Sequence, residues 1–137
     1  MSISNNFLRL GVLAILVGVS LGIWMGSNQN FTLRPVHTHI NLIGWASMML
    51  SGLVYRAIPE AARGWMPMAH FGLAVIGFLV MMTSLTVVLL GNPAAVPFLI
   101  ASEITVFVSL ILFAVIVFRA TTEAGAARPS QFSQINP

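Results

Sequence analysis

The chain has 137 residues, of which 58% are hydrophobic and only 7% are charged, and its net charge is +3. A soluble domain usually carries about 25% charged residues, so this chain has too few to cover a globule and is predicted to be an integral membrane protein. It has no cysteine, which excludes disulfides and thiolate metal sites. Its six basic residues, all arginines, are too sparse for a nucleic-acid interface.

Four apolar runs follow one another, at about 7–26, 36–58, 65–90 and 94–118. Each is close to the ~20 residues that a helix needs to cross a bilayer. The sequence therefore predicts an all-α, four-helix membrane bundle in 1–120. The tail, 121–137, is rich in Ala, Ser, Gln, Gly and Pro, a composition typical of disorder. The first run is longer than a signal-peptide core of about 7–15 residues, so we expect it to be retained as an anchor.

Glycines mark one face of the first run, and prolines mark the limits of the second. Pro35 suits the first turn of a helix, and Pro59 disfavours helix at the residue before it. A helix face without side chains suits close contact with another helix. The glycines of this face, at spacings of seven and four, are Gly11, Gly18, Gly22 and Gly26.

The arginines predict the orientation in the membrane. Arg34 alone lies between the first and second runs, and the other five lie on the opposite side. Because cytoplasmic loops carry an excess of basic residues, we expect both termini and the loop near residue 60 to lie in the cytoplasm, with the chain in a bacterial inner membrane. The five are Arg9, Arg56, Arg63, Arg119 and Arg128.

The polar residues gather at the outer start of the second run, around His37 and His39. Residues two positions apart on a helix do not face the same way. We therefore expect one histidine to ligate a metal and the other to support it, unless the helix begins between them. His37 starts a polar or small face, and His39 starts a more apolar one. The two faces are His37, Asn41, Gly44, Met48, Ser51, Tyr55 and His39, Ile43, Ala46, Leu50, Leu53.

Imidazole is a common heme ligand, and its second nitrogen is usually oriented by a hydrogen bond. The candidate cofactor is therefore heme iron, or copper, at His37 or His39, with Arg34 as a partner for a propionate and Asn41 beside the histidines. The alternative is a hydrated pair of histidines at the membrane surface, with Asn41 bound to a neighbouring helix.

Two further residues could take part. Glu103 lies about two turns inside the outer end of the fourth run, where a carboxylate costs roughly 2.5–3.5 kcal/mol. We expect it to accept from a histidine, to pair with Arg34 or to be protonated, as a supporting group, as a proton relay or in a pairing between copies. The alternative is a protonated carboxyl that donates to a Ser or Thr of another helix. His70 lies near the inner end of the third run, where we favour a snorkelling or capping histidine over a second metal site. At about 1.5 Å per residue, His39 and His70 differ in height by roughly 20 Å, so they cannot hold one heme iron within one protomer.

One stretch carries a family resemblance. Arg34-Pro35-Val36-His37-Thr38 resembles the start of transmembrane helix two in subunit I of C-type heme-copper oxidases and nitric oxide reductases, where a histidine ligates the low-spin heme b. His39-x-Asn41-Leu42 resembles the same nitric oxide reductase motif read two residues later, and Tyr55 followed by Pro59 is similar to the end of that helix. The whole chain most resembles the small four-helix proteins called cytochrome c oxidase subunit I-like.

The resemblance implies a b-type heme in a protein used for electron transfer or for gas or heme sensing. That family's subunit has three arcs of four helices, so this chain resembles one arc. Copies could assemble into a homo-oligomer, for example a trimer, and supply the missing ligand. With three histidines, the chain is not expected to be a complete oxidase. The alternative function is a non-catalytic accessory or assembly subunit of a larger respiratory or copper-handling membrane complex, packed through the glycine face.

Overall fold

The described part of the chain, residues 2–126 of a computed structural model, is almost entirely helical and contains no strand. α1 spans Ile3–Asn28, α4 spans Met66–Leu89 and α5 spans Val96–Ala126. Two short 3₁₀ helices, η2 and η3, precede α4 and α5. Between α1 and η2, three helical segments follow one another without a break: α2 (Arg34–His39), the π-helix η1 (Ile40–Ser47) and α3 (Met48–Ala57). The 3₁₀ helices are Pro59–Ala62 and Pro93–Ala95.

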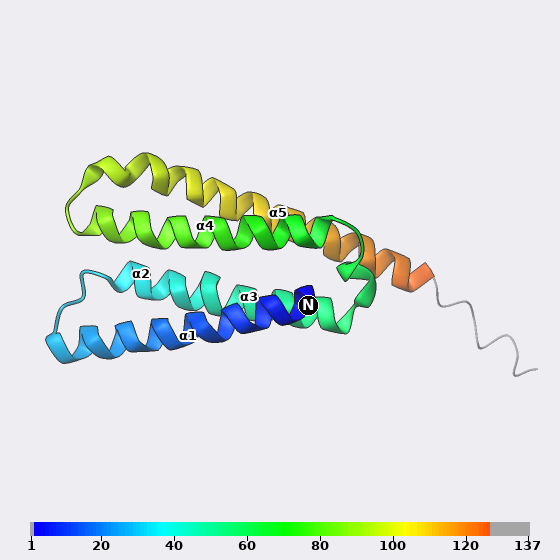
Figure 1. The fold of residues 1–137 in the computed structure, drawn as a ribbon, viewed down its shortest axis with the longest axis horizontal. Helices are drawn as coiled ribbons and strands as arrows, with labels where there is room; N and C mark the ends of the chain where they lie inside the picture. Colours follow the sequence, from blue (N-terminus) through cyan, green and yellow to red (C-terminus); the bar gives the residue numbers. More distant parts are fainter. Residues whose placement is uncertain (1, 127–137) are drawn as a thin grey trace, which may run out of the picture.

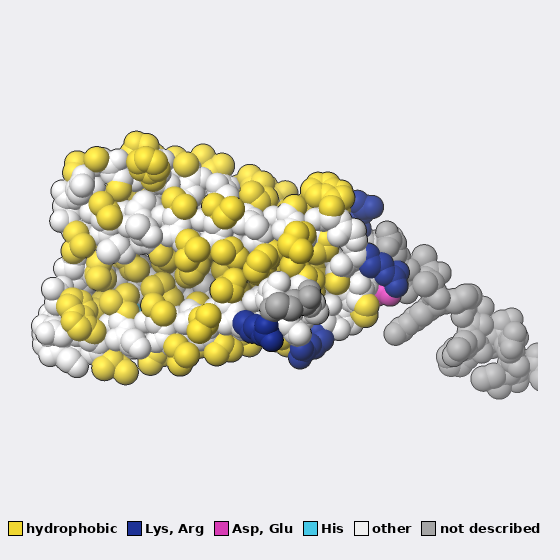
Figure 2. Space-filling model, in the orientation of Figure 1, with side chains coloured by type: hydrophobic (Ala, Val, Ile, Leu, Met, Phe, Trp, Pro, Cys, Tyr) yellow, Lys and Arg dark blue, Asp and Glu magenta, His cyan; other side chains and the backbone are white. Residues whose placement is uncertain are grey.

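Three helices are long and apolar enough to cross a membrane: Ile3–Asn28, Met66–Leu89 and Pro93–Thr122. Large apolar side chains project from them, among them Ile23, Phe98 and Phe107, each more than half exposed. Apolar side chains also spread over most of the face drawn in Figure 2. A surface of this kind suits contact with lipid, so the prediction of an all-α membrane protein is confirmed.

The helices form two hairpins that lie side by side (Figure 1). In one hairpin α1 packs along η1 and α3, and in the other α4 packs along α5. Two clusters of buried side chains join the hairpins. One surrounds Phe7 and Tyr55 near the N-terminus of α1, and the other surrounds Ala14, Ile40 and Met81.

Local sequence explains where the helices end. α1 ends at Gln29, which adopts the left-handed conformation (φ 52°) that commonly closes a helix. Pro35 lies in the first turn of α2, and Ile58, extended before Pro59, ends α3. α5 continues to Ala126, past the predicted end at Phe118. The rest of the predicted polar tail, 127–137, lies outside the described residues.

The glycine face of α1 is covered by the chain itself. A methyl group added at Gly11 would meet the side chain of Met49, and one added at Gly22 would lie 2.8 Å from Cε1 of His37. A methyl group at Gly26 would meet nothing within 4 Å. The expectation of close helix contact is therefore confirmed for Gly11 and Gly22. Because the second helical segment covers these glycines, they are not a free surface for a larger complex.

Candidate functional site

The side chain of His37 is half-buried, and both of its ring nitrogens are engaged within the protein. Its Nδ1 lies 2.8 Å from the carbonyl oxygen of Gly18. Since a carbonyl only accepts, Nδ1 carries the hydrogen, and Nε2 of the neutral ring accepts from Nδ2 of Asn41 at 3.2 Å. Both ring nitrogens are thus used, and His37 joins α2 to α1.

Asn41 completes this contact. Its Oδ1 is buried without a hydrogen-bond partner in the described part of the chain, and a methyl group at Gly18 would collide with that oxygen. Gly18 is therefore required for two reasons: its carbonyl accepts from His37, and its missing side chain leaves room for Asn41.

His39 is held differently. Its Nδ1 donates to the carbonyl oxygen of Pro35 at 2.7 Å, and the side chain is half-buried. Nε2 has no hydrogen-bond partner among residues 2–126. A ring whose Nδ1–H is bound to a backbone carbonyl presents an unprotonated Nε2, which is the usual arrangement of a metal-ligating histidine. The two histidines therefore differ in role, and His39 is the one whose Nε2 is available.

Arg34, the predicted propionate partner, and Glu103, the predicted partner of a histidine or of Arg34, form no bond with either histidine in the described residues. Arg34 is exposed, and its guanidinium carbon lies 5.4 Å from the ring centroid of Phe31. Glu103 is exposed on α5, and within the described residues it forms no hydrogen bond or ion pair with His37, His39 or Arg34. The expected pairing of Glu103 with a histidine or with Arg34 within one copy is therefore wrong. The neighbouring residues Ser102 and Val106 are buried against the other helices, whereas the side chain of Glu103 is exposed.

The residues present fit a heme only in part. His39 offers an oriented axial ligand, but the larger cavities, of about 310, 350 and 380 Å³, have neither His37 nor His39 in their lining. No group of three or more His, Cys, Asp or Glu side chains gathers among residues 2–122. Within the described residues, one copy thus offers a single oriented imidazole, at His39, that does not line any of these larger cavities.

The π-helix η1 follows His39 directly, and nothing in the sequence predicts it. Ser47 Oγ donates to the carbonyl oxygen of Leu42, five residues earlier, at 2.9 Å, in the register of a π-helix. Gly44 within η1 lies against Phe78 of α4 and Ala14 of α1. π-helical turns occur frequently at functional sites, and this one lies between the outer histidines and the inner part of the chain.

A second polar cluster lies around His70, near the N-terminus of α1. The side chain is 2% exposed, and its Nδ1 lies 2.8 Å from the hydroxyl of Tyr55. Its ring stacks between Phe7 and Phe113, with both centroid distances 4.9 Å. The favoured interpretation of a snorkelling or capping histidine is therefore wrong. A heme at His70 is not favoured either, because the cavity that His70 lines has a volume of only about 20 Å³.

A simple signal could have found this pair. In an antiparallel helical hairpin with a short connection, residues at equal distances from the turn lie side by side. Tyr55 lies two residues before the end of α3 at Ala57, and His70 lies four residues after the start of α4 at Met66, so the two are at similar distances from the connection.

The two clusters are far apart. His37 contacts Gly22 and His70 stacks on Phe7, and both of these lie on α1. Fifteen residues of α-helix separate Phe7 from Gly22, a rise of about 22 Å. The prediction that His70 cannot share an iron with the outer histidines is therefore supported.

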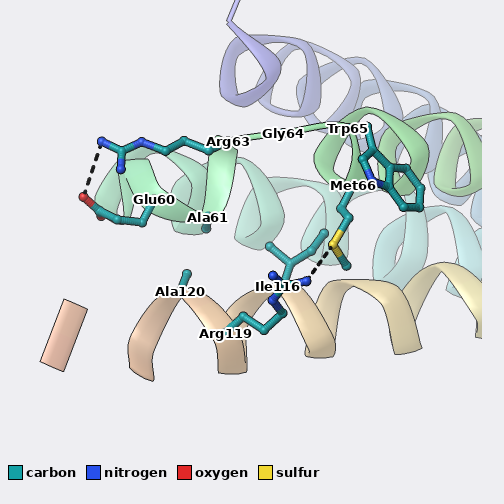
Figure 3. Close-up of a pocket in the computed structure, with 9 residues that line it drawn as sticks. All are labelled: Glu60, Ala61, Arg63, Gly64, Trp65, Met66, Ile116, Arg119 and Ala120. Atoms are coloured by element: carbon teal, nitrogen blue, oxygen red, sulfur yellow. Dashed lines mark hydrogen bonds and ion pairs between the residues drawn. The ribbon is translucent and has the colours of Figure 1, made fainter. Parts of the chain in front are cut away.

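The end of the molecule near the N-terminus also carries most of the arginines of the described residues (Figure 2). Figure 2 shows dark-blue side chains at the end of the molecule near the N-terminus. Arg63 lies 4.0 Å from Glu60, and Arg119 donates to Met66 Sδ at 3.6 Å, beside a cavity of about 310 Å³ (Figure 3). Trp65, 73% exposed, lines the same cavity. An exposed tryptophan next to arginines is typical of a membrane–water boundary.

Comparisons of the chain with protein families, with curated proteins and with solved structures found no match. The site is therefore interpreted from its own geometry.

Proposed function

We propose that this chain is a four-helix membrane subunit that presents His39 as one axial ligand to a b-type heme at an interface between copies. The observation that carries the proposal is the hydrogen bond of 2.7 Å from His39 Nδ1 to the Pro35 carbonyl. It fixes the ring, sets the tautomer and leaves Nε2 available, whereas both nitrogens of His37 are engaged.

The fourth membrane crossing in this proposal is the uninterrupted helical stretch Arg34–Ala57. Its 24 residues are enough for the ~30 Å hydrocarbon core. The arginines support an orientation in which both termini and the loop around η2 are cytoplasmic. His39 then lies near the outer surface of a bacterial inner membrane. The resemblance of 33–59 to subunit I of heme-copper oxidases favours the same depth and direction.

The second ligand comes from another copy in this proposal. His70 is too far away, and no group of three potential ligands gathers in the described residues. Two half-buried His39 rings from neighbouring copies would supply both axial positions. Arg34, one turn outward and free of any carboxylate partner in the described residues, would face a propionate. A bound heme supplies one-electron transfer or gas binding, and the chain supplies the ligand, the charge and the apolar surroundings.

The first experiment is a pyridine hemochrome assay with metal analysis on the protein purified in mild detergent. The proposal predicts protoheme at less than one per chain, because copies share it, and bis-histidine absorption bands. Protein that takes up neither heme nor copper, even on reconstitution, would sink the proposal.

A second candidate function is a non-catalytic subunit of a larger membrane complex, and Glu103 favours it. A carboxyl group exposed among Ile100, Ile104 and Phe107 is costly in lipid, so a helix with a hydrogen-bond donor at this depth would stabilise it. Co-purification of a second membrane protein, lost in Glu103→Leu and accompanied by no heme, would support this alternative.

A further inference from the structure

His70 and three serines line one small cavity between the two hairpins. The cavity has a volume of about 20 Å³, and the lining includes Ser47 and Ser51 from the second helical segment, His70 from α4 and Ser109 from α5. His70 and Ser109 are each 2% exposed and Ser51 is 5% exposed. A cavity needs about 10–15 Å³ and two to four polar partners to hold a water molecule. This cavity is large enough for one water, and its four polar residues provide the partners, while its other lining residues are apolar.

The hydrogen bond to Tyr55 determines what His70 offers to this cavity. The buried hydroxyl of Tyr55 has His70 Nδ1 as its partner, at 2.8 Å. If Nδ1 donated instead, the hydrogen of Tyr55 would lack an acceptor among the described residues, and a buried Tyr hydroxyl usually finds one. The phenol therefore donates, Nδ1 accepts, and the neutral ring carries its hydrogen on Nε2.

Two of the serines need a hydrogen-bond donor in the cavity. Ser51 Oγ already donates to the Ser47 carbonyl at 2.8 Å, and Ser47 Oγ donates to the Leu42 carbonyl at 2.9 Å. Each hydroxyl has one hydrogen, so both can only accept from the cavity. Ser109 Oγ is 3.4 Å from the His70 carbonyl, a long bond that leaves it free to turn.

We propose that this cavity is a binding site for one water molecule, which accepts from His70 Nε2–H and donates to the serine oxygens. A bound metal ion would require an unprotonated Nε2, whereas water accepts and donates at once. The water connects both hairpins, because His70 and Ser109 belong to the α4–α5 hairpin whereas Ser51 belongs to the other. It extends a hydrogen-bonded chain from Tyr55 toward η1, independently of any heme at His39.

Solution NMR on protein in lipid nanodiscs, with ¹⁵N-labelled histidine, tests this site. The expected result is an Nε2–H tautomer for His70 and a cross-relaxation peak between Hε2 and bound water. An Nδ1–H tautomer, or an Hε2 without any water contact, would overturn the proposal.

Two variants that reduce the cavity volume test whether the water binds there. Ser109→Val fills the space, and the water peak should be lost while the Nε2–H tautomer and the helical circular dichroism remain. Ser51→Thr adds a methyl group, keeps the hydroxyl and serves if the valine variant does not fold. Ser84→Ala is the control, since Ser84 is also buried on α4 but bonds to the Val80 carbonyl and does not line the cavity. Full retention of the peak in both filled variants contradicts the proposal.

Discussion

His37 and Gly18 join the second helical segment to α1 through a hydrogen bond of 2.8 Å between Nδ1 and the carbonyl oxygen. This bond separates the roles of two histidines that the sequence places only two residues apart. His37 is part of the packing, and His39, bound to the Pro35 carbonyl, is the one that presents a free Nε2.

Gly22 should tolerate no side chain. A methyl group there would lie 2.8 Å from His37 Cε1, and overpacking a helix contact costs about 1–3 kcal/mol. Gly22→Ala should therefore lower the thermal unfolding temperature in detergent. Gly26→Ala is the matched control, because its methyl group meets nothing within 4 Å and alanine favours helix. Equal unfolding temperatures for the two variants would refute this packing.

Replacing the two histidines should affect stability differently. His37→Ala leaves the Asn41 amide without its partner and removes the link to Gly18, at a cost of about 1–3 kcal/mol. His39→Ala removes only a local bond on a half-buried side chain, so its effect should stay within about 0.5 kcal/mol. Chemical unfolding in mixed micelles measures both. A larger loss of stability in His39→Ala than in His37→Ala would contradict the assignment of His37 to packing and of His39 to ligand binding.

Tyr55→Phe tests the buried inner pair. The change removes the hydroxyl at 2.8 Å from His70 Nδ1 and leaves a buried nitrogen without a partner, at a cost of about 1–3 kcal/mol. Thr83→Val is a suitable control, because its hydroxyl bonds locally to the Leu79 carbonyl on an exposed position of α4. If both variants have the same free energy of unfolding as the unchanged protein, the Tyr55–His70 bond contributes nothing to stability.

The exposed carboxyl of Glu103 should matter for association and little for the folding of one copy. Glu103→Leu should reduce the fraction of cross-linked oligomer in native membranes, and Glu103→Gln, which still forms hydrogen bonds, should retain part of it. Phe107→Leu, on the same exposed region of α5, serves as the control. Oligomers of unchanged yield in Glu103→Leu would show that this carboxyl has no partner in another copy of the chain.

Much of the fold is predictable because membrane helices leave strong signals. The apolar runs predict helices, Pro35 and Pro59 limit the second helical segment, and Gly11, Gly18 and Gly22 predict the face of α1 that meets it. These features act locally, so they can be read without knowing the tertiary contacts.

The rest depends on contacts between helices. A regular 3.6-residue period gives no sign of the π-helix η1. The sequence does not predict the burial of His70, because depth in the membrane alone does not show whether a side chain faces lipid or a neighbouring helix. The predicted depth of Glu103 brings it level with the histidines. The direction of its side chain, however, depends on which side of α5 packs against the other helices.

Heme titration of the two single-histidine variants tests the central claim most directly. Each purified protein, His37→Ala and His39→Ala, is reconstituted with heme at a temperature at which both are folded, and the Soret band is followed. The account predicts a bis-histidine spectrum in His37→Ala and its loss in His39→Ala. A Soret band that survives in His39→Ala and disappears in the folded His37→Ala variant would contradict it.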